Sequence, residues 1–511
     1  MKTSSPRAIP HPTPELPANV GAPFTFGDEL ADCRFGDKRL VKRAVRIADA
    51  ALAHPESSIP AFCGTASQAE GLYRFVANPA VEAAEIVRAH TKCTLERIGE
   101  RPVLVVSDSS TFGYGKETRR TGLGPTTDQG QGFTAHTSLA IDEATGMPLG
   151  LLAVHTWVRP HEDAVDPATL VDANGKALYG TKRGKPRKKP AKKQDDPTNE
   201  SARWLNQARA CSSLLGERPH IHVSDRESDA YTYMDGLIRD GLRFIARVNH
   251  NRVTTNGRLF ETIDGYEVKL TRTVHLSRRA TPKGTEQRRT HPARSARDAD
   301  LAISAGTVTL RRPSTAPRTS SKELKVNVVL VREPNPPPDC APVLWRLYTT
   351  ESVDTPEAIT RVVDGYVSRW LTEELYKALK TGCSFLNHQL ESYSALQKLL
   401  AVLLVVAWKL LTIRTVARLA PQAPATVVLT PLQVRLLKAL HDREHPRKPL
   451  PAMPSAKEAM YALAGLAGHF KSNGDPGWQT LGRGLRRLLQ AEYDYHVLGP
   501  MRDADRISNS S

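Results

Sequence analysis

Residues 355–382, TPEAITRVVDGYVSRWLTEELYKALKTG, carry the start and stop signals of a single long helix. Thr355 can cap the first free N–H groups, and Pro356 suits the first helical position. Gly382 can end the last turn. The stretch therefore predicts one long helix.

Four polar side chains fall within about 60° of one another on this helix if each residue turns by about 100°: Tyr366, Arg369, Glu373 and Lys380. Burying them without partners would cost several kcal/mol, so this stripe must face something polar. A metal-binding carboxylate beside donors for phosphate oxygens is what cleavage of a nucleic-acid backbone requires. An exposed helix with a Glu373–Lys377 ion pair is the alternative, and the helix alone does not decide between them.

Composition narrows the class of protein. The 511 residues suggest about two to four domains, and 71 Lys and Arg against 54 Asp and Glu give a net charge of +17. Such an excess favours a polyanionic partner. The six cysteines form no CxxC pair, so neither a disulfide framework nor a zinc site is indicated. We find no apolar signal segment, and the run 399–408 between Lys398 and Lys409 is too short to span a bilayer, so we expect a cytoplasmic protein without a membrane partner.

The N-terminal part reads as an arm followed by helices. Residues 1–24 are polar and proline-rich, which predicts disorder, and residues 25–98 predict a small helical unit. Within it, residues 37–53 place apolar side chains on one helix face and basic ones, including Arg39 and Arg43, on the other. Phosphate contact and simple solvation explain this basic face about equally well.

Two short apolar runs predict buried strands that end alike. The run 101–107 (RPVLVVS) is followed by Asp108, and the run 220–224 (HIHVS) is followed by Asp225. The first run is almost wholly apolar and β-branched, as expected for a central strand covered on both faces, and the second reads as another short strand. Each acid also has a structural alternative, a turn residue for Asp108 and a helix N-cap for Asp225.

The remaining segments differ in periodicity. Strands are also predicted at 134–141, 149–157 and 243–248, and residues 252–349 alternate with period two, which predicts an antiparallel β insertion. The segment 182–193 reads as a basic loop, which either contacts DNA phosphates or is solvated. Residues 384–500 read as helices only.

The small residues of one C-terminal helix allow another helix to approach closely: Ala459, Ala462, Gly465 and Gly468. A dimer face and packing within the chain are equal alternatives.

Three carboxylates thus stand out, namely Asp108, Asp225 and Glu373. Phosphodiester cleavage with two divalent ions needs about that many hard oxygen ligands, because Mg²⁺ keeps several waters. The pattern therefore indicates metal-dependent chemistry on nucleic acid.

The spacing Tyr366-x2-Arg369-x3-Glu373-x6-Lys380, after Asp108 in VVSDSSTF and Asp225 in HVSDRESDAY, resembles the signature of the Tn-five/IS-four group of cut-and-paste DNA transposases. Other matching stretches are GDKRLVKR (36–43), EGLYRFVANP (70–79), RFIAR (243–247), NPP (335–337), WRLYTTE (345–351) and LTP (429–431). The resemblance spans residues 25–498. The basic loop has no counterpart, and Asn249 stands where a relative has lysine.

The resemblance implies an RNase H-like catalytic core at 99–383 with the β insertion at about 252–349, a helical DNA-binding domain at 25–98 and a helical dimerisation domain at 384–511. It implies that Asp108, Asp225 and Glu373 bind two Mg²⁺ or Mn²⁺ ions. It further implies that Tyr366, Arg369 and Lys380 hold phosphates of the transposon end and that Trp345 stacks where a base has been flipped from the duplex. Arg247 would also contact DNA, and Arg39 and Arg43 would contact the terminal repeat. For Trp345, a place in the core is the competing interpretation.

The implied chemistry is nicking, hairpin formation, hairpin opening and transfer of the 3′ ends into target DNA, by a homodimer that pairs two terminal inverted repeats. It would act in the bacterial cytoplasm, on the nucleoid when bound to DNA. A catalytically inactive DNA-binding regulator and an RNase H-like nuclease without strand transfer are the alternatives.

Overall fold

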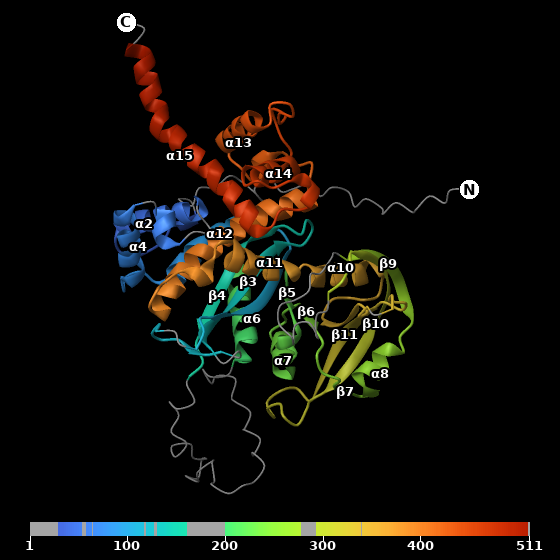
Figure 1. The fold of residues 1–511 in the computed structure, drawn as a ribbon. Coiled ribbons are helices and arrows are strands. Elements are labelled where there is room, and N and C mark those ends of the chain that lie inside the picture. The colour runs from blue at the N-terminus through green and yellow to red at the C-terminus, as the bar shows by residue number, and fades with distance from the viewer. Residues whose placement is uncertain are drawn as a thin grey trace, which may run out of the picture.

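A computed structural model describes residues 29–508 except 54–57, 64, 117–118, 127–129, 161–199, 277–292 and 339. The predicted arm at 1–24 and the basic loop at 182–193 lie outside the described residues. A mixed sheet forms the centre, with N-terminal helices against one part of it and C-terminal helices above (Figure 1). All six cysteines are free, as the sequence indicated.

The middle of the sheet is built from five strands in the order β4-β3-β1-β5-β6. Their bounds are β1 (Val103–Gly113), β3 (Gln131–Asp142), β4 (Pro148–Trp157), β5 (His220–Ser224) and β6 (Phe244–Arg247). β1 pairs in parallel with β5, and β5 with β6, whereas β3 and β4 run antiparallel. The short β2 (Gly124–Pro125) adds to β3. The mixed α/β class predicted from the apolar runs is confirmed.

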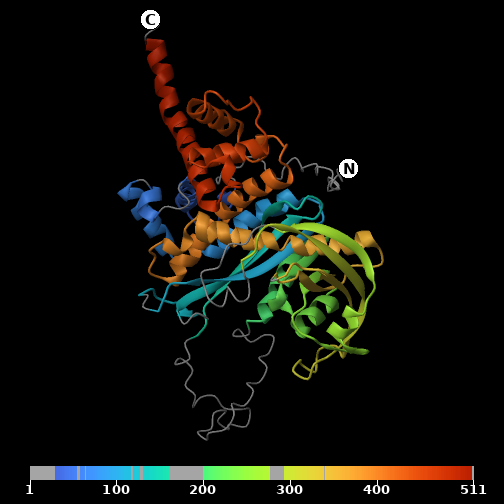
Figure 2. The ribbon, with the colours of Figure 1, turned by 45° about the vertical axis from the view of Figure 1, so that its right-hand side comes forward.

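The segment predicted as a β insertion is antiparallel and continuous with this sheet. It contains β7 (Val253–Thr254), β8 (Gly257–Arg258), α8 (Leu259–Asp264), β9 (Val268–Leu276), β10 (Arg297–Arg311), β11 (Glu323–Arg332) and β12 (Leu344–Thr349). β12 pairs with β6, so the described strands form one sheet of twelve. The insertion curves away from the N-terminal helices, on the opposite side of the molecule (Figures 1 and 2).

The single helix predicted over 355–382 is wrong, because the chain breaks it near Ser368. It forms α10 (Pro356–Val367), α11 (Trp370–Lys377) and a π turn, η4 (Ala378–Gly382). The Ser368 hydroxyl donates to the Asp364 carbonyl (3.1 Å), and this competition with the backbone bends helices. The predicted start is confirmed, since Thr355 accepts a hydrogen bond from the Ala358 N–H (3.2 Å).

The other helices flank the sheet. The N-terminal ones are α2 (Lys38–Ala53), α3 (Ile59–Cys63), α4 (Ala66–Ala77) and α5 (Ala83–Ile98), and α6 (Ala202–Leu215), η3 (Arg226–Ser228) and α7 (Tyr231–Arg239) lie between strands. The C-terminal ones are η5 (Phe385–Asn387), α12 (Tyr393–Leu419), η6 (Ala425–Val427), α13 (Pro431–Glu444), α14 (Ala456–Leu466), η7 (Lys471–Asn473) and α15 (Trp478–Ser508). α15 projects beyond the body of the protein (Figure 1).

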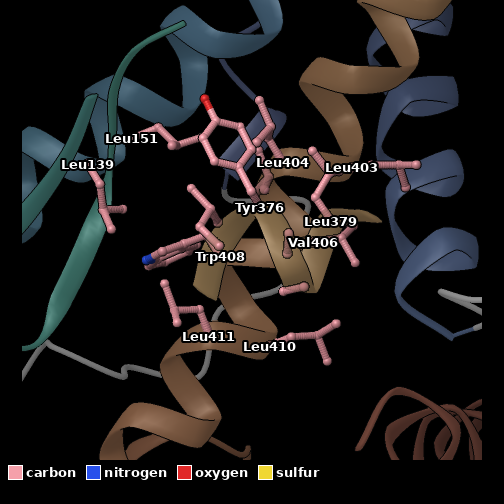
Figure 3. Close-up of a cluster of buried hydrophobic side chains, with 14 of the residues drawn as sticks. Leu139, Leu151, Tyr376, Leu379, Leu403, Leu404, Val406, Trp408, Leu410 and Leu411 are labelled. Atoms are coloured by element: carbon pink, nitrogen blue, oxygen red, sulfur yellow. The ribbon is translucent and has the colours of Figure 1, made fainter. Parts of the chain in front are cut away.

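Helix α12 is the centre of the hydrophobic core. By length and composition it could cross a membrane, but 94% of its most apolar window is buried inside the fold. Leucine side chains of α12 surround Trp408 and meet residues of the sheet and of α11 (Figure 3). The expectation that the apolar run is too short to span a bilayer is wrong by length, because α12 continues past Lys398 and Lys409, and both lysines are buried with it. The ammonium of Lys398 donates to the carbonyls of Val76 (3.0 Å) and Asn78 (2.8 Å), at the end of α4.

Small residues of α14 are used within the chain. Ala459 and Ala462 are buried, and α15 comes so close that a Cβ on Gly484 would lie 1.7 Å from the Leu463 carbonyl oxygen. A side chain at Gly465 would meet open space. Packing within the chain thus accounts for the two alanines, and the homodimer stays a prediction.

Glu29 ties the N-terminal helices to the sheet through a buried charge network. Its carboxylate lies 2.5 Å from Nδ1 of His90 and pairs with the Arg97 guanidinium. Nε2 of His90 accepts the Leu151 N–H (3.0 Å), so Nδ1 carries the proton and donates to Glu29. Burial alone would raise the pKa of Glu29, but His90 and Arg97 outweigh it and lower that pKa to about 2.

Glu29→Gln is expected to lower the free energy of unfolding at pH 7 by about 2–4 kcal/mol, because the folded carboxyl has the lower pKa. The contribution is fully present above pH 4.5 and is lost as pH falls toward 2. Urea unfolding at several pH values checks it. The control is Glu70→Gln, which removes an exposed ion pair with Arg74 and should change stability by under about 1 kcal/mol. Equal effects of the two substitutions would contradict this role of Glu29.

Candidate active site

Pairing of β1 with β5 brings two of the predicted acids together. Val106 lies opposite Val223, and continuing this register by two residues places Asp108 opposite Asp225. Asp108 lies within β1 and not in a turn after it, because β1 continues through Gly113 to pair with β3. Asp225 directly follows β5, and its side chain accepts the Glu227 N–H (2.8 Å), so the N-cap alternative also holds for it.

Arg369 joins the third acid to the first. Its guanidinium lies 3.2 Å from Oδ2 of Asp108 and 2.6 Å from Oε1 of Glu373. The alternative Glu373–Lys377 pair is wrong, since the Lys377 ammonium pairs with Glu374 (2.9 Å). The polar face of α11 therefore points at β1.

The other two residues of the predicted stripe lie on the same side but have internal partners. The Lys380 ammonium donates to the Thr111 carbonyl of β1 (2.8 Å), and its burial lowers its pKa. The Tyr366 hydroxyl lies 3.3 Å from the Arg247 guanidinium. Both side chains must exchange these partners if they are to reach a phosphate.

The electrostatics of Asp108 show how crowded the acids are. Burial raises its pKa, the carboxylates of Asp225 and Glu373 raise it further, and Arg369 and the Ser109 N–H oppose them. The result is a pKa of about 7. A carboxyl group shifted in this way by burial and by like charges is typical of a functional site.

The donor set suits a divalent cation. Asp108, Asp225 and Glu373 supply hard carboxylate oxygens, which Mg²⁺ and Mn²⁺ prefer. Within the described part of the chain, no three Asp, Glu, His or Cys side chains are arranged closely enough to hold a metal ion. Arg369 instead supplies the positive charge between Asp108 and Glu373. The residues fit such an ion in chemistry, and a closed ligand set requires Arg369 to turn away.

Trp345 lies on β12 beside the stripe. It is half-buried and meets Tyr366 edge to face, with ring centroids 5.6 Å apart. It packs with Leu347 on the core side, whereas Tyr348 faces a second cluster, because successive side chains of a strand point to opposite faces. Half-burial leaves both interpretations of Trp345 open, so base stacking stays a prediction.

The basic residues of α2 lie apart from the three acids. Arg39 is 91% exposed and pairs with Asp37. Arg39 and Arg43 line a hollow between α2 and α4 together with Arg74. A Cβ on Gly71 would lie 2.1 Å from the Arg43 guanidinium. The absence of a side chain at this position of α4 therefore leaves the space that the Arg43 guanidinium occupies.

Two residues near the acids had no signal in the sequence. Arg203 on α6 donates to the hydroxyl of Ser109, the residue after Asp108 (3.2 Å), and pairs with Glu227, two residues after Asp225 (2.6 Å). Tyr376 on α11 contacts the backbone of Asp108. Their local sequences are typical of ordinary helices. Only the contacts with distant segments show that these two residues lie near the acids.

Comparison with known proteins points to one class. Residues 26–81 match the transposase DNA-binding family, and this segment contains Arg39 and Arg43. Among solved structures, the cryo-EM structure of the piggyBac transposase synaptic complex with hairpin DNA aligns over 67% of this chain and 53% of that chain. The sequence identity is 9% and the TM-score 0.30. This alignment spans about half of that chain, and so loose a superposition carries no argument. The chain thus has an N-terminal segment similar to the DNA-binding part of transposases.

Asp108→Asn is expected to stabilise the protein at pH 8 by about 1–3 kcal/mol in EDTA. The folded carboxyl keeps its proton up to about pH 7, whereas the unfolded one loses it near 3.8, so ionisation costs stability as pH rises through this window. Denaturant unfolding at pH 4 and pH 8 checks this. The free energies of unfolding of the wild type and Asp108→Asn should differ only at pH 8. Asp298→Asn, at a side chain that is 71% exposed, is the control and should show no such change. A destabilised Asp108→Asn at pH 8 would contradict the repulsion among the acids.

Proposed function

We propose that this chain is a DNA transposase of the Tn-five/IS-four group, which binds transposon ends, cleaves them and joins the 3′ ends to target DNA. The observation that carries the proposal is the placement of Asp108 opposite Asp225, with Arg369 joining Asp108 to Glu373 at the start of α11. These acids are separated by 225 − 108 = 117 and 373 − 225 = 148 residues. The match of residues 26–81 to transposase DNA-binding segments supports the same function.

We infer an RNase H-like core from the arrangement of the strands. Three antiparallel strands, β4, β3 and β1, continue into the parallel strands β5 and β6. The first two acids lie on β1 and directly after β5, with the third on a helix packed beside them. This arrangement supports a single reaction centre beside the point where β1 and β5 stop pairing.

Asp108, Asp225 and Glu373 would hold two Mg²⁺ or Mn²⁺ ions. Such ions, when bound, activate a water or a 3′-hydroxyl and stabilise the leaving oxyanion. Arg369 would exchange the carboxylates for a phosphate of the transposon end, because its fork suits either partner. The raised pKa of Asp108 means that it must lose its proton before it can act as a ligand.

The DNA path follows from the cationic and aromatic residues. Arg39 and Arg43 would bind the terminal inverted repeat, and Tyr366, Lys380 and Arg247 would contact phosphates near the cut. Trp345 would stack where a base leaves the duplex during hairpin formation. A homodimer would pair two ends in the bacterial cytoplasm, on the nucleoid.

Asp108→Asn, Asp225→Asn and Glu373→Gln are each expected to abolish Mg²⁺-dependent nicking of an end-bearing duplex while DNA binding stays within about threefold. The inverted repeats that flank the gene supply the duplex. Gel assays of cleavage and of band shift check this. The matched control is Glu374→Gln, a neighbouring carboxylate that pairs with Lys377 and Arg414, and it should keep nicking.

The same assays separate the alternatives. Binding without any nicking by the wild-type protein would indicate a regulator. Nicking without joined product on a target plasmid would indicate a nuclease. Nicking that survives loss of any one of the three acids would contradict the proposed metal ligands.

Arg39→Ala combined with Arg43→Ala is expected to reduce the slope of log affinity against log salt by up to about 1.8, because each phosphate contact contributes roughly 0.9. Titrations of an end duplex between 50 and 300 mM KCl measure the slope. Arg209→Ala is the control, because Arg209 is half-exposed and pairs with Asp240 on a different part of the molecule. An unchanged slope in the double variant would mean that the basic face of α2 is solvated and does not contact phosphates.

A further inference from the structure

We propose that Tyr376 is a positioning residue, which sets the distance between the helix of Glu373 and the strand of Asp108 and so tunes the cation affinity of the site. This inference rests on the proposed function, because it assumes that these acids bind the cation. Tyr376 was not among the residues that the sequence singled out.

The phenol oxygen of Tyr376 touches both strands at the position of the first acid. It lies 3.1 Å from the carbonyl of Asp108 and 3.1 Å from the carbonyl of Ala135, which share its proton. It accepts a hydrogen bond from the Thr137 hydroxyl (3.1 Å). Asp108 and Thr137 are themselves partners across β1 and β3. One hydroxyl thus binds α11 to the backbone of Asp108, whose carboxylate is one of the proposed cation ligands.

The same tyrosine is coupled to Glu373 by the helix. Residues three apart lie on one helix face, so Glu373 and Tyr376 both point from α11 toward β1. The ring is buried in the apolar cluster around α12 (Figure 3). It also meets Phe112 of β1 edge to face, with centroids 6.3 Å apart. The ring therefore anchors the helix, and the hydroxyl fixes its distance from the strand.

Arg369 and Tyr376 join the same two elements in different ways. Arg369 links the carboxylate heads of Asp108 and Glu373, and it must release them before these oxygens can bind a cation. Tyr376 links α11 to a backbone carbonyl, which no cation or phosphate replaces. The tyrosine can therefore hold the spacing of the acids after Arg369 has turned away. Supporting partners of metal ligands typically change metal affinity 10- to 100-fold when they are lost.

Tyr376→Phe keeps the ring and removes only the hydroxyl. We expect this variant to bind Mn²⁺ about 10-fold or more weakly than the wild type, measured on the full-length protein without DNA by the EPR signal of free Mn²⁺. Thermal unfolding is recorded for each variant. The matched control is Tyr393→Phe, because the Tyr393 hydroxyl donates to the Thr156 hydroxyl (2.9 Å) between α12 and β4, away from the acids. It should bind Mn²⁺ like the wild type.

Asp108→Asn separates failure of this inference from failure of the proposed function. If the wild type and Asp108→Asn bind Mn²⁺ equally, the acids are not the cation site and both proposals fall. If Asp108→Asn loses binding but Tyr376→Phe stays within twofold of the wild type, only the positioning role is overturned. An equal loss of Mn²⁺ affinity in Tyr376→Phe and Tyr393→Phe would also overturn it, because general loosening would then explain both.

Discussion

The backbone hydrogen bonds between β1 and β5 are the constraint on which the candidate site depends. They fix a parallel register in which Asp108 stands opposite Asp225, just past the last paired residues of β1 and β5. A slip of one residue would turn every side chain of one strand to the opposite face. The apolar side chains of both strands are buried on both faces, so such a slip would have to repack two closely packed faces of the sheet at once. Packing of the core thus determines the spacing of two charged groups at its edge.

Burial and charge repulsion act together at this edge. Burial raises the pKa of Asp108 most, and the nearby carboxylates of Asp225 and Glu373 raise it further. Arg369 offsets the repulsion from the junction of α10 and α11, where the helix breaks after Ser368. A carboxyl group whose pKa is raised by burial and by like charges is typical of a functional site.

Helix α12 joins several parts of the chain into one hydrophobic core. Its side chains meet the N-terminal helices, the sheet, α11 and the C-terminal helices, so a single core connects all these parts. Lys398 and the Glu29 network show how polar groups are accommodated within it, each with buried partners that offset desolvation. The elements that carry Asp108 and Glu373 are therefore held against one another by a continuous apolar core, which a metal site needs if its ligands are to keep their spacing.

The sequence by itself determined the mixed α/β class and the antiparallel insertion, and it singled out three acids as candidates, because apolar periodicity and residue type are local properties. It misplaced the details that depend on distant segments. Asp108 lies inside a strand because β3 extends the pairing, and Lys398 is buried because the end of α4 supplies carbonyls. The tertiary structure alone decided that Arg369 spans two acids and that the Tyr376 hydroxyl reaches β1 and β3. Contacts between residues more than two hundred positions apart leave no periodic trace in a single sequence, since only the packed core fixes which side chains meet.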